Sequence, residues 1–244
     1  MLASFALAVQ FLTRFPLNIK IELTNKRLGQ SVLFYPLIGL LIGALLYSLA
    51  YFLPAHSIQL NAAIILSIWI FITGGLHLDG LADCSDAWVG GLNDKTRSLA
   101  IMKDPSSGPI AVIVLILVLL LKWTALQQLL TQEANWVPLL AAPFLGRLSI
   151  LILMLSTPYI RENGLGSAMQ QYLPKKIAHI FLGIALTCSF WLISAYIVII
   201  TLLLIALIRY LSLQRIQGIT GDVYGASVEI IEASILVSWV LIYG

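Results

Sequence analysis

The chain alternates between long apolar runs and short polar connections, a pattern typical of membrane-spanning helices. A helix rises ~1.5 Å per residue, so about 20 apolar residues are needed to cross ~30 Å of hydrocarbon. Runs of this order cover residues 31–53, 60–78, 108–130, 137–156, 177–211 and 222–243. The run 177–211 is too long for one crossing, so we divide it near Ser194. The pattern therefore predicts about seven transmembrane helices.

Residues 1–12 are also apolar, but they are too few to cross the hydrocarbon. They have neither the basic start nor the small-residue cleavage site of a signal peptide. We predict a helix that lies at the membrane interface and ends at Arg14-Phe15-Pro16, because proline ends helices. No polar stretch is long enough for a soluble domain. The sequence therefore predicts one membrane-embedded domain, residues 1–244, with an all-α, polytopic helical-bundle fold.

Composition supports this class of protein. Hydrophobic residues make up 60% of the chain and charged residues only 10%, whereas soluble domains carry about 25% charged residues. Cys84 lies in an acidic motif and Cys188 in a later apolar run, and they lack the spacing of a zinc site, so we expect neither a structural disulfide nor a zinc site. The net charge of +3 does not indicate nucleic-acid binding, because the basic residues do not form one patch along the chain.

The basic residues instead divide the connections into two sets. Of the fourteen Lys and Arg residues, Lys122 and Arg147 lie inside apolar runs, which leaves twelve in the connections. These twelve, all on one predicted side, are Arg14, Lys20, Lys26, Arg27, Lys95, Arg97, Lys103, Arg161, Lys175, Lys176, Arg209 and Arg215. Since cytoplasmic loops of membrane proteins are enriched in Lys and Arg, we expect that side, with the amino terminus, to face the cytoplasm.

One acidic motif is the main candidate for chemistry. Residues 74–91 read GGLHLDGLADCSDAWVGG, and Asp79, Asp83 and Asp86 are spaced i, i+4 and i+7. On a helix these side chains fall within about 60° of one another. Three carboxylates this close repel unless positive charge neutralises them, and an all-oxygen cluster suits Mg²⁺. The alternative is a solvated polar helix end, which would need neither the five glycines nor the apolar run before Asp79.

A second acidic set lies in the last apolar run. Asp222, Glu229 and Glu232 fall within about 80° of one helical face, and Asp222 lies on the same predicted side as the aspartate motif. Glu229 and Glu232 lie within the run, where an ionised side chain needs a partner or a polar cavity. Arg147 is the candidate partner for Glu229. A purely structural ion pair involving Glu232 and Arg147 is an equal alternative.

The connection at residues 94–108 carries cations close to the aspartates in sequence. Arg97 and Lys103 are phosphate-binding candidates in that setting, although a charged loop is more often a solvated surface. His77 precedes Asp79 by two residues, which on a helix points it away from the acidic face, so we interpret it as a packing or interfacial residue.

Six blocks of sequence, in order along nearly the whole chain, resemble the adenosylcobinamide-GDP ribazoletransferases, the cobalamin synthases. They are Phe11-Leu12-Thr13-Arg14-Phe15-Pro16, Tyr35-Pro36-Leu37-Ile38-Gly39-Leu40, residues 74–86, Ile101-Met102-Lys103-Asp104, Arg161-Glu162-Asn163-Gly164-Leu165-Gly166, and Thr220-Gly221-Asp222 with Glu229 and Glu232. The chain departs from the family in two places. It has Asp83-Cys84-Ser85-Asp86-Ala87 where a glycine commonly follows the second acid, and Lys103-Asp104-Pro105-Ser106-Ser107-Gly108 where an arginine commonly follows the serine.

The resemblance implies a Mg²⁺-dependent membrane transferase. In such an enzyme a hydroxyl of α-ribazole, or of its 5′-phosphate, attacks the cobinamide-linked phosphorus of adenosylcobinamide-GDP and GMP leaves. We assign Asp79, Asp83, Asp86 and Asp222 to the metal and the diphosphate, and Lys103, Arg97 and Arg161 to phosphate contacts. Asp86 or Asp222 is expected to act as the general base.

The implied setting is the cytoplasmic (inner) membrane of a bacterium, with a multi-pass chain in the lipid bilayer and the site facing the cytoplasm. A homo-oligomer is possible, and no nucleic-acid partner is expected. Two other functions remain open. One is another Asp-rich membrane transferase, of the CDP-alcohol or prenyl-diphosphate type, and the other is a cation transporter that uses Glu229, Glu232 and Arg147.

Overall fold

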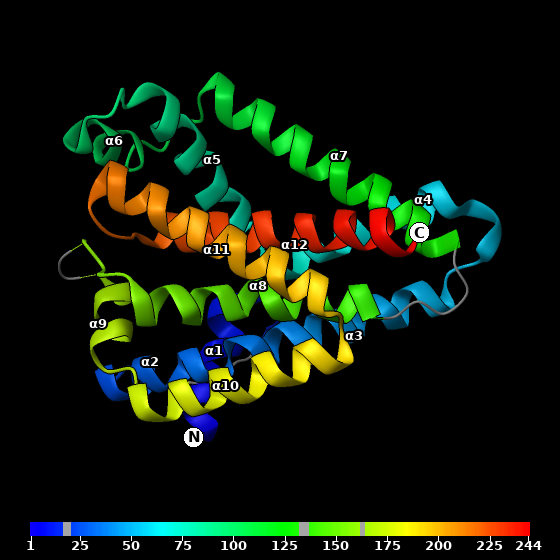
Figure 1. Cartoon of the computed structure of the whole chain (residues 1–244), viewed down its shortest axis with the longest axis horizontal. Helices are drawn as coiled ribbons and strands as arrows, with labels where there is room; N and C mark the ends of the chain where they lie inside the picture. Colours follow the sequence, from blue (N-terminus) through cyan, green and yellow to red (C-terminus); the bar gives the residue numbers. More distant parts are fainter. Residues whose placement is uncertain (17–20, 132–136, 162–163) are drawn as a thin grey trace.

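The computed structural model describes residues 1–16, 21–131, 137–161 and 164–244, and its regular structure there is helical apart from one isolated bridge. The helices form an elongated bundle (Figure 1). They are α1 (Leu2–Leu12), α2 (Asn25–Ser31), α3 (Tyr35–Phe52), α4 (Ile58–Thr73), α5 (Leu76–Gly90), α6 (Lys95–Ile101), α7 (Pro109–Thr131), α8 (Val137–Ser156), α9 (Leu165–Gln171), α10 (Lys175–Leu192), α11 (Ala195–Ile216) and α12 (Gly221–Tyr243), with 3₁₀ turns at Val32–Phe34 and Ala55–Ser57.

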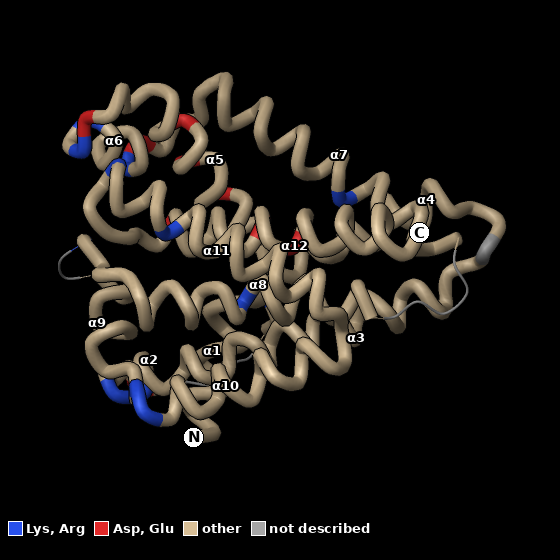
Figure 2. The backbone as a smooth tube through the Cα atoms, viewed as in Figure 1, with Lys and Arg blue, Asp and Glu red and all other residues tan. Residues whose placement is uncertain are grey.

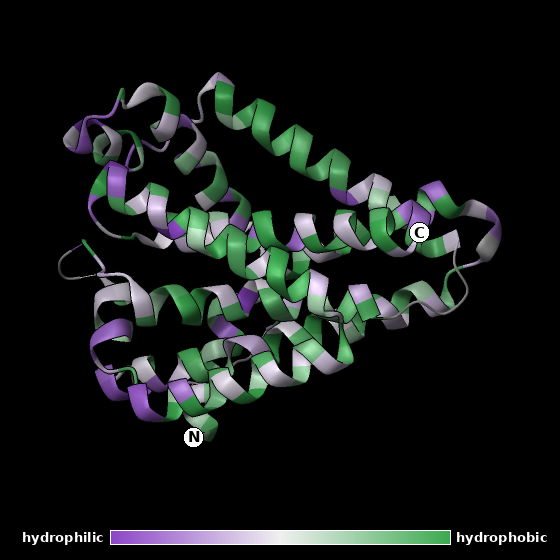
Figure 3. Ribbon diagram, viewed as in Figure 1, coloured by the Kyte–Doolittle hydropathy of each residue, from purple (hydrophilic) through white to green (hydrophobic). Residues whose placement is uncertain are grey.

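Length and hydropathy make this a multi-pass membrane protein. Among the described residues, 6 helical segments are long and apolar enough to cross a membrane, or up to 7 if the bent pair α4 and α5 counts as one span. Figure 3 shows hydrophobic residues along α7 and hydrophilic residues mainly toward the two ends of the bundle. The expected all-α polytopic bundle is therefore confirmed. So is the break near Ser194, because α10 ends at Leu192 and α11 begins at Ala195.

The second predicted span, residues 60–78, is wrong as a single helix. α4 ends at Thr73, and α5 begins at Leu76 after a bend of 88°. Gly74 and Gly75 form the bend with φ angles of 65° and 68°, a region that side chains with a Cβ strongly disfavour. The acidic residues consequently lie on a helix of their own, α5, instead of at the end of a spanning helix.

The amino-terminal helix is short and packs against the bundle. α1 ends at Leu12, just before the predicted stop at Arg14-Phe15-Pro16, and buries Leu7, Ala8 and Leu12. The backbone N–H of Arg14 then donates to the carbonyl of Ile72 at 2.6 Å. This bond joins the end of α1 to the last turn of α4, next to the bend. The location of α1 at a membrane interface stays a prediction.

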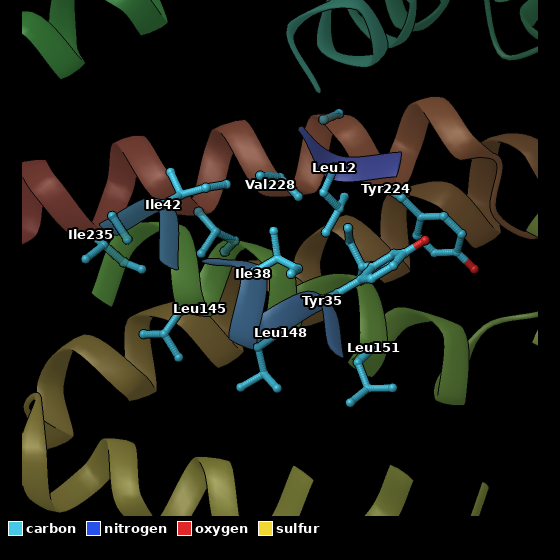
Figure 4. Close-up of a cluster of buried hydrophobic side chains, with 14 of the residues drawn as sticks. Leu12, Tyr35, Ile38, Ile42, Leu145, Leu148, Leu151, Tyr224, Val228 and Ile235 are labelled. Carbon is cyan, nitrogen blue, oxygen red and sulfur yellow. The ribbon is translucent and has the colours of Figure 1, made fainter. Parts of the chain in front are cut away.

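The core lies around α8 and α12. Over an apolar stretch of 18 residues in each helix, 72% of α8 and 61% of α12 is buried, against 22% of α7 and 17% of α10. Figure 4 shows the apolar side chains between α3, α8 and α12, among them Ile38, Leu148 and Val228. α8 and α12 are thus the inner helices, and α7 and α10 present most of their surface outward.

The charged residues have two locations. Figure 2 shows Lys and Arg gathered at the end of the bundle that holds α6, α2 and the start of α10, with two exceptions near its middle. The exceptions are Lys122 on α7 and Arg147 on α8, both buried. Lys20, one of the basic residues sorted by sequence, lies outside the described residues.

Lys122 and Arg147 form a buried ionic cluster with two carboxylates of α12. Lys122 Nζ lies 2.6 Å from Oε2 of Glu229 and 2.6 Å from Oε2 of Glu232. Arg147 donates through Nη1 to Glu232 Oε1. The predicted pair of Arg147 with Glu229 is therefore wrong, because Arg147 pairs with Glu232. Lys122, for which no partner was predicted, contacts both carboxylates.

The cluster has a structural role that follows from electrostatics. Two positive and two negative side chains give no net charge, and Lys122 also lies 4.6 Å from the centre of the Trp69 ring. Removing one member from such a site leaves a buried charge without compensation, which is much more costly than losing a surface pair. The cluster therefore fixes the rotation and depth of α12 relative to α7 and α8.

We predict that Lys122→Met lowers the free energy of unfolding by about 3–5 kcal/mol, because it leaves Glu229 buried without its cation. Lys122→Met combined with Glu229→Gln should recover much of that loss. Unfolding in detergent micelles measures both values. Arg147→Met should couple more strongly with Glu232→Gln than with Glu229→Gln, and equal coupling energies would contradict the observed pairing.

Candidate active site

The site begins where α5 crosses the start of α12. Gly80 lies against the backbone of Asp222, so closely that a Cβ at position 80 would come within 2.6 Å of the Asp222 carbonyl oxygen. One turn further, Gly225 lies against the backbone of His77. Because neither glycine has a side chain, the two helix backbones approach each other directly. This contact brings the acidic helix α5 next to Asp222, although Gly80 and Asp222 are 142 positions apart in the sequence.

A short backbone pairing brings Arg161 to the same place. The segment after α8 pairs with the segment before α12 through the Tyr159–Ile219 bridge, in which the Ile160 N–H donates to the Ile219 carbonyl at 3.0 Å. Arg161 follows directly and donates through Nη2 to Asp222 Oδ2 at 2.6 Å. Its Nε is buried and has no hydrogen-bond partner within the described chain. An unpaired guanidinium N–H beside carboxylates is suited to an anionic ligand.

Two of the four aspartates carry no side-chain hydrogen bond to the described residues. Asp79 is exposed, and Asp83 is half-buried. Asp83 lies within electrostatic range of Asp79, Asp86, Asp222 and Arg161. The structure thus brings the acidic face of α5 and the Arg161–Asp222 pair into one electrostatic unit in which negative charge exceeds positive charge.

Asp86 has a different environment from its neighbours on α5. Its Oδ2 accepts the N–H of Gly108 at 2.5 Å, and its Oδ1 accepts the N–H of Ala111 at 3.0 Å. Gly108 directly precedes α7 and Ala111 lies in its first turn, where free N–H groups and the helix dipole favour a negative charge. Asp86 therefore caps α7 from another helix. This role was not predicted from the sequence, where the one available signal is an α7 start at Gly108-Pro109 without a capping side chain of its own.

The candidate cations are unequally placed. Arg161 Nη2 reaches the carbonyl of Met102 at 3.4 Å, which puts Lys103 next to it in the chain. Lys103 and Arg97 are both exposed, and Arg97 uses its backbone N–H to complete the Asp94 cap of α6. Ser106 hydrogen-bonds to Asp104 through its N–H and its hydroxyl, and these bonds lower the pKa of the Asp104 carboxyl. Glu162 and Asn163 of the sequence motif lie outside the described residues.

A cavity of about 270 Å³ opens beside the crossing of α5 and α12. Asp79 and Asp222 contribute to its wall, together with aromatic and aliphatic residues of five further segments. The wall contains His77 and four aromatic residues, Phe11, Tyr35, Tyr159 and Tyr224. Burial raises the pKa of the Tyr159 phenol, so this side chain is neutral at physiological pH. The structure confirms that His77 is buried, as a packing residue should be, but it also places His77 in the cavity wall.

The donor set fits Mg²⁺ in a particular way. Among the described residues no three His, Cys, Asp or Glu side chains are grouped so that they would hold a metal ion by themselves. Mg²⁺, however, is commonly held by one or two carboxylates with water and substrate phosphates. Asp79 and Asp83 offer such oxygens without internal partners, whereas those of Asp86 and Asp222 have hydrogen-bond donors. The residues therefore fit a metal shared with a phosphate ligand.

Comparison with known proteins gives a match over almost the entire chain. The family model for cobalamin-5-phosphate synthase matches residues 4–240. The chain belongs to the cobalamin-5-phosphate synthase family. It is 49% identical over 243 residues to the adenosylcobinamide-GDP ribazoletransferase of Pseudomonas aeruginosa strain PAO1, with 98% of each chain covered. It is 43% identical over 244 residues to the Acinetobacter baumannii strain ACICU protein of the same name, and the match covers 99% of this chain and 98% of that protein. No solved structure is significantly similar.

Family membership confirms the resemblance seen in the six sequence blocks, and with it the expectation of a transferase. A cobalamin-5-phosphate synthase family match also disfavours the two other functions that the sequence left open, a CDP-alcohol or prenyl-diphosphate transferase and a cation transporter. The roles assigned to single aspartates and cations remain predictions.

The capping geometry of Asp86 predicts a difference within the acidic face. Asp86→Asn should lower the free energy of unfolding by roughly 1–2 kcal/mol, because the amide loses the charge and one of two acceptor oxygens at the start of α7. Asp79→Asn, at an exposed position without a partner, should leave it unchanged or raise it. Thermal unfolding without added divalent metal compares the two variants, and equal losses would contradict the assigned role of Asp86.

Proposed function

We propose that the chain is a Mg²⁺-dependent transferase that joins α-ribazole, or its 5′-phosphate, to adenosylcobinamide-GDP and releases GMP. The observation that carries this proposal is the proximity of two unpaired carboxylates, Asp79 and Asp83, to the Arg161–Asp222 pair, with Asp79 and Asp222 in the wall of one cavity. Relatives named adenosylcobinamide-GDP ribazoletransferase over nearly the full length support the choice of substrates.

In this reaction a ribose hydroxyl oxygen forms a bond to the phosphorus that carries the cobinamide. The bond between that phosphorus and the bridging oxygen of the diphosphate breaks, and GMP leaves with the bonding electrons. The hydroxyl proton passes to a base. Transfer of this kind depends mainly on positioning and on neutralising the phosphate charge, and less on covalent chemistry by the protein.

The described side chains divide these tasks. Asp222 lies in the cavity wall and is paired with Arg161, whereas both Asp86 oxygens accept backbone N–H groups, so Asp222 is the better placed of the two predicted bases. Arg161 keeps its Nε free to donate to a phosphate oxygen, with Lys103 beside it. Asp86 holds the start of α7 in place, so in this proposal it positions the loop 103–108 and is neither base nor ligand. Arg97 is exposed on α6 and attracts phosphate at longer range.

Asp79 and Asp83 would hold the metal, with substrate phosphate and water completing the coordination. Bound Mg²⁺ would supply charge stabilisation for the diphosphate and the leaving GMP. Without it, the acidic face of α5 would repel an anionic substrate. A requirement for metal is thus expected from the charge balance of the residues themselves.

We further propose that the chain resides in a bacterial inner membrane with this site facing the cytoplasm. The site lies at the end of the bundle where Lys and Arg residues are concentrated (Figure 2). Enrichment of basic residues in cytoplasmic connections supports that orientation.

Activity tests the proposal directly. Purified protein should release GMP from adenosylcobinamide-GDP only when α-ribazole and Mg²⁺ are both present. Asp79→Asn and Asp83→Asn should lower kcat at least ~100-fold, since each removes a carboxylate at the metal and the phosphates. Glu22→Gln is the control, because Glu22 is an exposed acid whose partner, Arg27, lies on α2. Full activity of both aspartate variants, or turnover without divalent metal, would refute the assignment.

Orientation is tested by labelling. A cysteine at Thr96 on α6 should react with a membrane-impermeant thiol reagent from the cytoplasmic side only, and a cysteine at His56, between α3 and α4, from the opposite side only. Both positions are exposed. Cys84 and Cys188 are both free, as expected, and would first be replaced by alanine. Reaction of both introduced cysteines from the same side would contradict the proposed orientation.

A further inference from the structure

The cavity beside Asp79 and Asp222 has a closed, apolar inner wall and an open mouth. The inner wall includes Leu12, Tyr35 and Ile150, all buried. The mouth includes Phe11 and Leu165, whose side chains are partly exposed. At about 270 Å³ the cavity is somewhat smaller than the roughly 300–1,000 Å³ typical of sites that enclose a whole drug-sized ligand. It is therefore suited to one part of a larger substrate.

Aromatic rings dominate this cavity. Phe11 stacks on Tyr35 with ring centroids 6.1 Å apart and planes at 11°. Tyr224 and Tyr159 form a second stacked pair, at 6.1 Å and 20°. Figure 4 shows Tyr35 and Tyr224 close together near Leu12. Rings arranged in this way offer flat faces on which a planar heterocycle can stack.

Two residues that line the wall each carry a buried polar atom with no hydrogen-bond partner among the residues that the structure describes. These atoms are Nδ1 of His77 and the hydroxyl of Tyr224, whose residues are 3% and 5% exposed. An unpaired polar atom in a buried position costs free energy, and native proteins rarely leave one without a reason. The two atoms indicate a ligand with one or two polar groups and an otherwise apolar surface.

We propose that the cavity binds the base of α-ribazole, which is 5,6-dimethylbenzimidazole; this inference rests on the proposed function. The base is a planar pair of fused rings with two methyl groups and one ring nitrogen able to accept a hydrogen bond. Tyr224 donates its hydroxyl proton to that nitrogen, or His77 does so through Nδ1–H. The ribose then lies toward the part of the wall that Asp79 and Asp222 form.

The other substrate fits this cavity poorly. The guanine of adenosylcobinamide-GDP has several donors and acceptors along its edge, and most would be buried without partners against an apolar wall. The corrin macrocycle is too large for the volume. The nucleoside and the nucleotide-activated corrinoid therefore occupy different parts of the site, and the aspartates lie between them.

Equilibrium binding of α-ribazole to the full-length protein in detergent with Mg²⁺, measured by calorimetry, tests the cavity. Tyr224→Phe should raise Kd about tenfold while leaving the melting temperature equal or higher, because the lost hydroxyl has no partner within the described protein. Tyr47→Phe makes the same chemical change on α3 outside the cavity and should leave Kd unchanged.

A second pair of variants tests stacking at the mouth. Phe11→Ala should also weaken binding about tenfold. Phe190→Ala on α10 should not, although Phe190 is 39% exposed and Phe11 is 41% exposed. Wild-type protein should bind guanosine at least tenfold more weakly than α-ribazole. Unchanged Kd in both Tyr224→Phe and Phe11→Ala, no α-ribazole binding by wild type, or equal affinity for guanosine would each overturn the cavity proposal.

GMP release measured on the same preparations separates this inference from the proposed function. If α-ribazole binding responds to the cavity variants but wild-type protein never releases GMP, the base site stands and the proposed transferase activity fails. If GMP is released but the cavity variants bind normally, the transferase activity stands and the base site is wrong.

Discussion

The structure depends on how a mostly apolar bundle accommodates carboxylates. An ionised acid within or beside hydrocarbon must be balanced by a nearby positive charge or opened to water. The chain uses both solutions on one helix. At its start, α12 carries Asp222, paired with Arg161 at the edge of a cavity. About 10–15 Å further along, Glu229 and Glu232 are buried and neutralised by Lys122 and Arg147.

These two solutions produce different chemistry. The inner cluster has equal numbers of positive and negative groups, so it holds helices together and has no electrostatic need for a ligand. The outer group has four aspartates against one partly buried arginine, and two of those aspartates lack internal partners. An excess of negative charge next to an unpaired guanidinium N–H favours a metal ion bound together with a phosphate. By fixing α12, the inner cluster also fixes where Asp222 meets α5.

The sequence predicts the membrane spans and the acidic face of α5, but it does not predict the bend, the pairing of Lys122 or the aromatic cavity. Apolar run length is enough to find the spans, and the i, i+4, i+7 spacing is enough to find the acidic face of α5. The bend at Gly74-Gly75 was missed because an apolar run continues on both sides of it. Lys122 was left unpaired because its partners depend on the rotation of α7 about its axis, which a nearly uniform apolar sequence does not reveal. The aromatic cavity assembles from segments distant in sequence, so no local pattern predicts it.

The central claim is that Asp79 and Asp83, near the Arg161–Asp222 pair, bind a divalent metal together with substrate phosphate. Anomalous scattering from crystals grown with Mn²⁺ and adenosylcobinamide-GDP tests it most directly. We expect metal within about 2.0–2.3 Å of oxygens from Asp79 or Asp83 and in contact with a phosphate oxygen. Clear density for the bound diphosphate with no metal on α5, or with metal only at Glu229 and Glu232, would contradict the account.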